Sequence, residues 1–200
     1  MEYLKENFTS VSDYYECDSF SGIDFSSFNI VESAFQSCDF QSCFFNKNNL
    51  FNCSFRDCRF NCCQISLVLL KNTMFSDIQI IESKILGLNF SECNNISFSI
   101  DFNSSIIDSV VMFEKNLKKT KYINCTIRNT DFDNCEMKGC DFSGTKFEKT
   151  SFHNCNLEKS DFSKSIGYQI DPSTNKLKEA KFSIPEAISF LSYLGIKLVD

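Results

Sequence analysis

A five-residue period between Thr130 and Phe162 constrains the fold of this chain more than any other feature. A large apolar residue recurs at every fifth position: Phe132, Met137, Phe142, Phe147, Phe152, Leu157 and Phe162. A small residue stands two positions before each of them: Thr130, Cys135, Cys140, Thr145, Thr150, Cys155 and Ser160. This period fits neither a helix nor a long strand. Residues two apart in an extended segment point to the same side, so both face inward and the next residues turn a corner. Repetition of this unit predicts a solenoid.

The same period runs from Phe20 to Phe90 and then slips. Phe90 and Phe102 are twelve residues apart, which is two units plus two residues. Insertions in a repeat protein become surface loops. We therefore expect a loop near residues 91–101, with these residues at its surface: Ser91, Glu92, Asn94, Asn95 and Ile96.

The two ends of the chain do not carry the repeat. Residues 1–16 predict an N-terminal cap, residues 17–166 the repeat domain, and residues 167–200 a C-terminal segment. The repeat ends at Phe162, and residues 163–182 are expected to form a polar connector. Ser183 as N-cap, Pro185 in the first turn and Glu186 at the capping-box position predict a short helix that stops at Gly195, before a final strand at residues 196–199.

The apolar residues of this helix cover more than one face. We expect one face to lie on the last coil and the other to contact a second copy of the chain. The residues expected to form this dimer interface are Ile188, Phe190, Leu191, Tyr193 and Leu194.

The cysteines are expected to be filler inside the solenoid. There are 12, without a CxxC pair or a zinc-like cluster, and all but Cys17 and Cys62 occupy the small inward site. The N-terminus lacks the apolar core of a signal peptide, and no apolar run approaches the length of a membrane span. We expect a cytoplasmic protein with free thiols and no bound metal.

Charge is unevenly distributed. Residues 1–100 hold 12 acidic and 6 basic side chains, and residues 101–200 hold 14 of each, which gives the net charge of −6. Such a chain is a poor direct binder of nucleic acid, but it suits a protein partner with a basic groove. The first outward position of the unit repeatedly holds aspartate: Asp24, Asp39, Asp101, Asp131, Asp141 and Asp161. These carboxylates either imitate phosphates or bond to the backbone of their own turns.

Outward apolar residues offer a second candidate surface. Leu67, Leu69, Met74, Ile81 and Leu86 fall at positions that the repeat exposes. They form either a partner-binding patch or a stretch of degenerate repeats.

An enzyme is disfavoured. The single histidine, His153, stands at an outward corner position, where we expect no cysteine or carboxylate arranged to act with it. The sequence contains no phosphate loop and no metal motif, and no cofactor is expected.

The unit A/C/S/T–D/N–F/L–x–x resembles the pentapeptide repeat over roughly Cys17 to Phe162. This resemblance implies an all-β solenoid, a right-handed quadrilateral β-helix of about seven coils, followed here by the short C-terminal helix. The tail from Gly167 to Asp200 resembles that of the Qnr quinolone-resistance and microcin immunity proteins.

The resemblance to this group implies a function. It predicts a bacterial homodimer, joined through the C-terminal segment, whose acidic surface mimics DNA. Such a protein binds a type II topoisomerase (DNA gyrase or topoisomerase IV) and protects it from quinolones or a gyrase poison. The alternative is a structural scaffold or interaction module with an unrelated partner.

Overall fold

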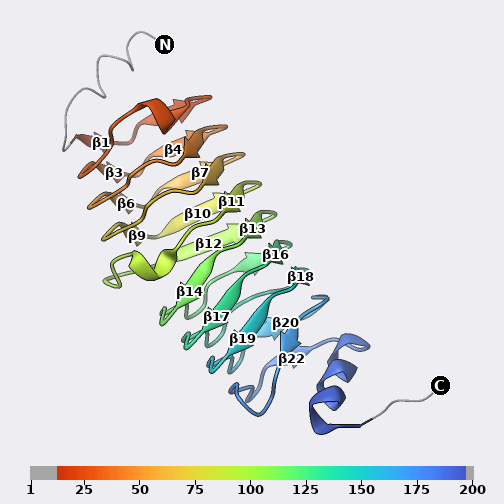
Figure 1. The fold of residues 1–200 in the computed structure, drawn as a ribbon. Helices are drawn as coiled ribbons and strands as arrows, with labels where there is room; N and C mark the ends of the chain where they lie inside the picture. Colours follow the sequence, from red (N-terminus) through yellow and green to blue (C-terminus); the bar gives the residue numbers. More distant parts are fainter. Residues whose placement is uncertain (1–12, 197–200) are drawn as a thin grey trace.

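The chain forms a rod of stacked coils (Figure 1). The computed structural model describes residues 13–196. Its parallel strands make a right-handed, four-sided β-solenoid of about 8 turns, closed at one end by a single short helix. The fold class is therefore the predicted one.

We number the faces of the rod in chain order. Face 1 contains β1 (Tyr14–Glu16), β3 (Ala34–Gln36), β6 (Ser54–Arg56) and β9 (Met74–Ser76). Face 2 contains β2 (Ser19–Ser21), β4 (Asp39–Gln41), β7 (Arg59–Asn61), β10 (Ile78–Ile81), β12 (Ile100–Asn103), β15 (Tyr122–Ile123), β20 (Asp161–Phe162) and β22 (Lys181–Phe182). Face 3 contains β5 (Phe44–Asn46), β8 (Gln64–Ser66), β11 (Lys84–Leu86), β13 (Ile106–Asp108), β16 (Thr126–Arg128) and β18 (Lys146–Glu148).

Face 4 contains β14 (Val111–Phe113), β17 (Asp131–Asp133), β19 (Ser151–His153) and β21 (Gln169–Ile170). An isolated bridge between Asn89 and Val111 extends face 4 toward the N-terminal end of the rod. The bridges Asn116↔Glu136 and Glu136↔Asn156 continue face 1 toward the C-terminal end. Within residues 13–196, three 3-10 helices complete the fold: η1 (Phe25–Ser27), η2 (Phe90–Glu92) and η3 (Glu186–Leu194).

The large residue of each unit fills the interior of the rod. Phenylalanines of successive coils stack face to face, with ring centroids 4.5 Å apart for Phe25 and Phe45 and 4.7 Å apart for Phe142 and Phe162. This spacing matches the distance of about 4.8 Å between neighbouring strands. The predicted inward period is confirmed along the rod.

The small residue of each unit is buried too, and it has a polar role beyond filling space. The Cys63 thiol donates to the Phe40 carbonyl at 3.3 Å, and the Thr73 hydroxyl donates to the Leu50 carbonyl at 2.8 Å. Each side chain thereby satisfies a buried carbonyl of the preceding coil. Ten cysteines are buried and free, and only Cys17 and Cys62 are exposed. Cysteine, serine and threonine therefore suit this site because they are small donors.

The repeat register changes once, at η2. Strand β7 pairs with β10 at a spacing of 20 residues (Phe60↔Ile80), whereas β10 pairs with β12 at a spacing of 22 (Ile80↔Phe102). The backbone N–H of Asn94 donates to the Thr73 carbonyl, and that of Ser99 donates to the Phe75 carbonyl. Two extra residues therefore bulge from face 1 between Asn94 and Ser99.

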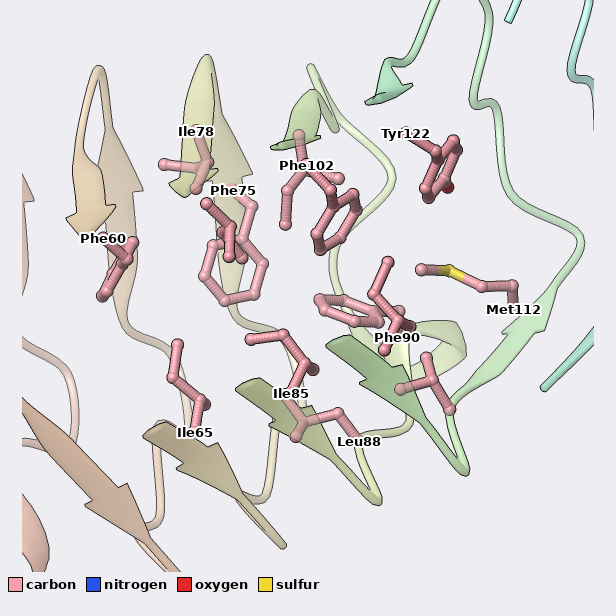
Figure 2. Close-up of a cluster of buried hydrophobic side chains, with 14 of the residues drawn as sticks. Phe60, Ile65, Phe75, Ile78, Ile85, Leu88, Phe90, Phe102, Met112 and Tyr122 are labelled. Atoms are coloured by element: carbon pink, nitrogen blue, oxygen red, sulfur yellow. The ribbon is translucent and has the colours of Figure 1, made fainter. Parts of the chain in front are cut away.

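The middle of the rod is aliphatic. Ile65, Ile80 and Ile85 take inward sites that hold phenylalanine in earlier coils, such as Phe45 and Phe60. Figure 2 shows Ile65, Phe75, Ile85, Leu88 and Phe90 pointing into the interior at this level. An apolar cavity of about 20 Å³ remains among these side chains. The aromatic stacks are thus interrupted where the repeat is weakest.

The rod extends beyond both predicted ends of the repeat, which is why it has about 8 turns and not seven. Tyr15 stacks on Phe35 at 5.0 Å, so β1 belongs to the first coil and not to a cap. The predicted cap otherwise lies in residues 1–12, outside the described residues. The predicted connector 163–182 is also wrong: Tyr168 and Ile170 are buried, and Phe182 stacks on Phe162 at 5.0 Å.

The C-terminal helix begins later than predicted. Pro185 is the N-cap of η3 and no side chain caps the helix, while the Ser183 hydroxyl accepts from the Lys164 N–H. The Ser183 assignment is wrong because that side chain is used to join the helix start to the last coil. Gly195 ends the helix with φ 71°, as predicted. The predicted final strand falls mostly in residues 197–200, outside the described residues.

Candidate functional site

The six predicted aspartates lie on three different faces. Asp24 lies before η1 on face 3 and Asp131 lies on face 4. The remaining four lie along face 2, namely Asp39, Asp101, Asp141 and Asp161. The structure therefore does not bring the six together into one stripe.

Basic residues interrupt the aspartates of face 2. Arg59 lies 4.0 Å from Asp39, Lys121 lies 3.8 Å from Asp101, and Lys181 lies 3.1 Å from Asp161. Each partner stands on the next coil in the same column of side chains. Such exposed pairs contribute little stability, but they cancel much of the negative field of face 2.

Several of these aspartates also stabilise their own turns. The Oδ1 atoms of Asp24, Asp141 and Asp161 accept the backbone N–H two residues further on, at 3.0, 2.9 and 2.8 Å. The hydrogen bonds from Ser26 lower the pKa of Asp24 below its ordinary value. Burial raises the pKa of Asp161, but donation from Ser163 and Lys181 outweighs it, and the net shift is downward. Aspartate at this position is thus a turn-forming residue.

Face 4 carries carboxylates that basic residues do not neutralise. Asp131 and Asp133 project from β17, and Asp171 follows β21. Between Asn89 and Asp171, the described residues of face 4 include no lysine or arginine, and Lys149 stands at the corner shared with face 3. Asp131 accepts a hydrogen bond from the Ser151 hydroxyl. This face is the most uniformly acidic part of the C-terminal half of the rod, which we call the lower rod.

Two of these carboxylates were not among the predicted site residues. Asp133 and Asp171 follow the inward residue of their units instead of preceding it. A column count at 20 residues per coil places Asp133 beside His153. Parallel stacking aligns the second outward positions as well as the first, so a carboxylate stands next to His153 in its column.

Face 1 has the opposite charge character in the same part of the rod. Lys118, Lys138, Lys176 and Lys178 are interspersed with Glu136 and Glu158. Lys138 pairs with Glu158 at 2.9 Å, which raises the pKa of that lysine and lowers the pKa of that glutamate. The lower rod is therefore acidic on face 4 and mixed to basic on face 1.

The predicted loop residues surround the bulge on face 1. Ser91 and Glu92 lie in η2, whose N-cap Asn89 accepts from the Ser91 N–H at 3.1 Å. The Asn94 side chain accepts from the Ile96 N–H at 2.8 Å, and the Asn95 side chain accepts from Lys115 at 2.5 Å. Ile96 is 71% exposed. The bulge is thus a hydrogen-bonded turn that presents one apolar side chain.

The outward apolar residues are split among the faces. Leu67 and Leu69 are about half exposed near the corner of faces 3 and 4, and Leu86 is half-buried on face 3. Met74 lies on face 1 and Ile81 on face 2, away from that corner. Face 4 adds Val111 and Phe113, both exposed, which the sequence did not single out.

The predicted dimer residues divide between two environments. Phe190 packs on Phe182, with ring centroids 4.8 Å apart, and seals the last coil. Ile188 and Tyr193 are 42% and 44% exposed. Leu191 is half-buried, and the side chain of Leu194 lies outside the described part of the structure. An apolar surface of the helix therefore faces away from the rod.

The described residues offer no metal site and no membrane span. Within residues 13–196 no group of three or more histidine, cysteine, aspartate or glutamate side chains is arranged to hold a metal ion. None of the helices in that range has the length and apolarity needed to cross a bilayer. Burial raises the pKa of Cys53 and Cys125 to about 11, which disfavours the reactive thiolate at these two sites.

Comparison with known proteins agrees with the repeat and the fold. Residues 116–165 match the family model for pentapeptide repeats, in 8 copies. A comparison with curated proteins gives no match. The matched residues cover a quarter of the chain, and the right-handed four-sided coil is the fold expected of this repeat.

Among solved structures, the chain resembles the Qnr group and other repeat proteins. Trypsin-treated QnrB1, a plasmid-mediated fluoroquinolone resistance protein, matches with a TM-score of 0.62 and 18% identity over 96% of this chain and 100% of that chain. A second QnrB1 structure matches with a TM-score of 0.51 and 16% identity over 94% and 99%. HetL, a pentapeptide repeat protein involved in heterocyst differentiation regulation in the cyanobacterium Nostoc, matches with a TM-score of 0.63 and 10% identity over 90% and 89%. At these identities the likeness concerns the fold.

Proposed function

We propose that this protein is a DNA mimic that binds DNA gyrase or topoisomerase IV and protects the enzyme from quinolones or a gyrase poison. The observation that carries the proposal is the acidic face 4, where Asp131 and Asp133 form no ion pair with a lysine or arginine in the described chain. A rigid wall that carries carboxylates suits a surface built to hold phosphates.

Face 4 replaces face 2 as the contact surface in this proposal. Lys121 and Lys181 neutralise Asp101 and Asp161, so a basic groove gains little from face 2. Face 4 has no such interruption in the lower rod. The bulge that presents Ile96 emerges on face 1, the face next to face 4, and offers a second, apolar contact to the same partner.

A dimer extends the proposed surface. Ile188 and Tyr193 offer a second copy the exposed side of η3, while Phe190 holds that helix on the rod. An isologous contact here joins two rods end to end. QnrB1, a plasmid-mediated fluoroquinolone resistance protein, shares this architecture, which adds weight to the same activity in this chain.

A supercoiling assay with ciprofloxacin tests the proposal. Purified gyrase, relaxed plasmid and drug are combined with increasing amounts of the protein, and recovery of supercoiling is expected. The double variant D131N/D133N is expected to protect less, whereas D101N/D161N on face 2 serves as the matched control and retains protection. If the wild-type protein neither binds gyrase nor protects it at any concentration, the proposal fails.

The second candidate is a scaffold with an unrelated partner. HetL, a pentapeptide repeat protein involved in heterocyst differentiation regulation, has an equally similar fold. The mixed charge of face 1 also departs from a DNA-like surface. Affinity capture with the native cytoplasm, followed by identification and reconstitution of a stable partner other than a topoisomerase, would favour this function.

A further inference from the structure

A groove on face 4 combines apolar and acidic walls. It runs between β14 and β17 and measures about 390 Å³. Strand β14 contributes Val111 and Phe113, which are 47% and 40% exposed. Strand β17 contributes Asp131 and Asp133, and the corner residue Asn129 also lines the groove. We call these five residues the face 4 groove.

The parallel register fixes the arrangement of the four wall side chains. Val111 pairs with Asp131, and Phe113 pairs with Asp133. Neighbouring strands lie about 4.8 Å apart, and alternate residues of one strand lie about 6.6 Å apart on the same side. Each carboxylate therefore stands beside an apolar side chain. The spacing of the two carboxylates lets one planar guanidinium group donate to both of them.

The carboxylates of the groove are available to a ligand cation. Neither Asp131 nor Asp133 forms an ion pair within the described residues. Asp131 uses Oδ1 to accept from Ser151, which leaves Oδ2. Arg128, the nearest arginine in sequence, points to face 3 and donates to Asp108 at 2.8 Å. The cation must therefore come from outside the described chain.

We propose that the face 4 groove binds an arginine side chain from a protein partner. The guanidinium group bridges Asp131 and Asp133, and its aliphatic stem lies on Val111 while its plane contacts the Phe113 ring. Arginine fits better than lysine because it offers five donors in a rigid fork and stacks on aromatic rings, whereas an ammonium is a strongly hydrated point charge. A phosphate group is repelled by the same two carboxylates.

This inference refines the proposed function by naming the partner group that face 4 receives, and it rests on that function only for the identity of the partner. Any protein that presents an exposed arginine between apolar neighbours has the required chemistry. The next coil places His153 in register with Asp133. The imidazole therefore borders the same carboxylate on the side of the next coil.

The test uses nuclear magnetic resonance of the isotope-labelled full chain with three capped tripeptides, Gly-X-Gly, in which X is arginine, lysine or citrulline. The arginine peptide is expected to shift the amide signals of residues 111–113 and 131–133 in a saturable way. The lysine peptide is expected to bind about fivefold more weakly, because it cannot bridge both carboxylates. Citrulline, the uncharged isostere, is expected to cause no shift.

Variants of the two aspartates test whether the arginine peptide binds in the face 4 groove. D133N and D131N are expected to weaken arginine binding about tenfold each, which is the effect of losing a charge-assisted bidentate contact. D161N, on face 2, is the matched control and is expected to bind like the wild type. Equal shifts with citrulline, shifts confined to other faces, or wild-type affinity in D133N would overturn the inference.

The outcome is separable from that of the topoisomerase proposal. If arginine binding is absent while gyrase protection is intact, the groove inference fails alone. If D133N loses arginine binding and the wild type has no effect on gyrase, the groove stands and serves another protein partner. Saturable shifts at the groove with a calcium salt but with none of the peptides would assign the carboxylates to a cation and also overturn the inference.

Discussion

The Nζ atom of Lys115 donates a hydrogen bond of 2.8 Å to the carbonyl of Cys93, inside the wall of the rod. The lysine is 1% exposed and occupies an inward site that holds cysteine, serine or threonine in other coils. Its Nζ also lies 5.0 Å from the centroid of the Phe98 ring. Lys115 fills the space opened by the two extra residues and ties the bulge to the coil below.

The stability contributed by Lys115 is expected to depend on pH. Burial lowers the pKa of this lysine from its ordinary value of 10.5. Between the lowered pKa and 10.5 the unfolded chain binds more protons than the native chain, so the free energy of unfolding rises with pH in that window. Urea unfolding of the wild type and K115M is measured at several pH values. The free energy of unfolding of the wild type is expected to rise relative to that of the variant as the pH approaches 10. Buried cysteines with raised pKa values, such as Cys53 and Cys125, are present in both proteins, so the difference between the two proteins reports on Lys115 and on its interaction with Cys93. A difference that stays constant or shrinks would contradict the assignment.

Filling the cavity in the middle of the rod is expected to stabilise the protein. Ile65 lines this cavity of about 20 Å³ and follows Phe25 and Phe45 in one column of face 3. The substitution I65F continues the stack and is expected to add about 1 kcal/mol to the free energy of unfolding. Thermal unfolding measures the effect. The matched control is I127F, in the same column but away from the cavity, which is expected to destabilise by about 2 kcal/mol through overpacking. A loss of stability in I65F would contradict the interpretation.

Gly167 is expected to tolerate no side chain. Its φ is 77°, and a Cβ atom would lie 2.3 Å from the carbonyl oxygen of Phe147 on the preceding coil. Gly22 has a similar φ of 64° with nothing within 4 Å of a Cβ atom. We expect G22A to cost about 1 kcal/mol from backbone conformation alone, and G167A to cost about 3 kcal/mol or more because of the added clash. Chemical denaturation distinguishes them, and equal losses would show that the close approach is absent.

The exposed side of η3 is expected to control dimerisation. Ile188 and Ser189 are neighbours on the helix, and both are exposed. In light scattering after size exclusion, the wild type is expected at twice the chain mass of 23.0 kDa. I188D is expected to shift it to the monomer, since an interface cannot bury an unpaired carboxylate, while S189D remains dimeric. A monomeric wild type, or a dimeric I188D, would contradict the assignment.

The repeat made most of the fold predictable from the sequence. The five-residue period defined which side chains point inward, and the slip between Phe90 and Phe102 located the bulge. The ends were less predictable because Tyr15, Tyr168 and Phe182 stack in the interior without a full repeat around them. Ser183 resembled a helix cap in the sequence, but contact with the last coil decided its role.

The candidate site was less predictable than the fold. Selecting the first outward position of each unit found Asp131 but passed over Asp133, which stands at the second outward position. The unit alone also does not reveal which columns contain opposing charges. Lys121 and Lys181 neutralise face 2 only when coils of 20 residues are stacked. The exposed Val111 and Phe113 carry no repeat signature at all, and only the structure places them against two carboxylates.

Competition with duplex DNA for purified gyrase is the most direct test of the central claim that this rod is a DNA mimic. A fluorescent duplex bound to gyrase is titrated with the protein, and anisotropy reports release of the DNA. The account predicts saturable displacement that weakens with added salt and requires a higher concentration of D131N/D133N than of the wild type. Folded wild-type protein that leaves the DNA bound at every concentration would contradict it.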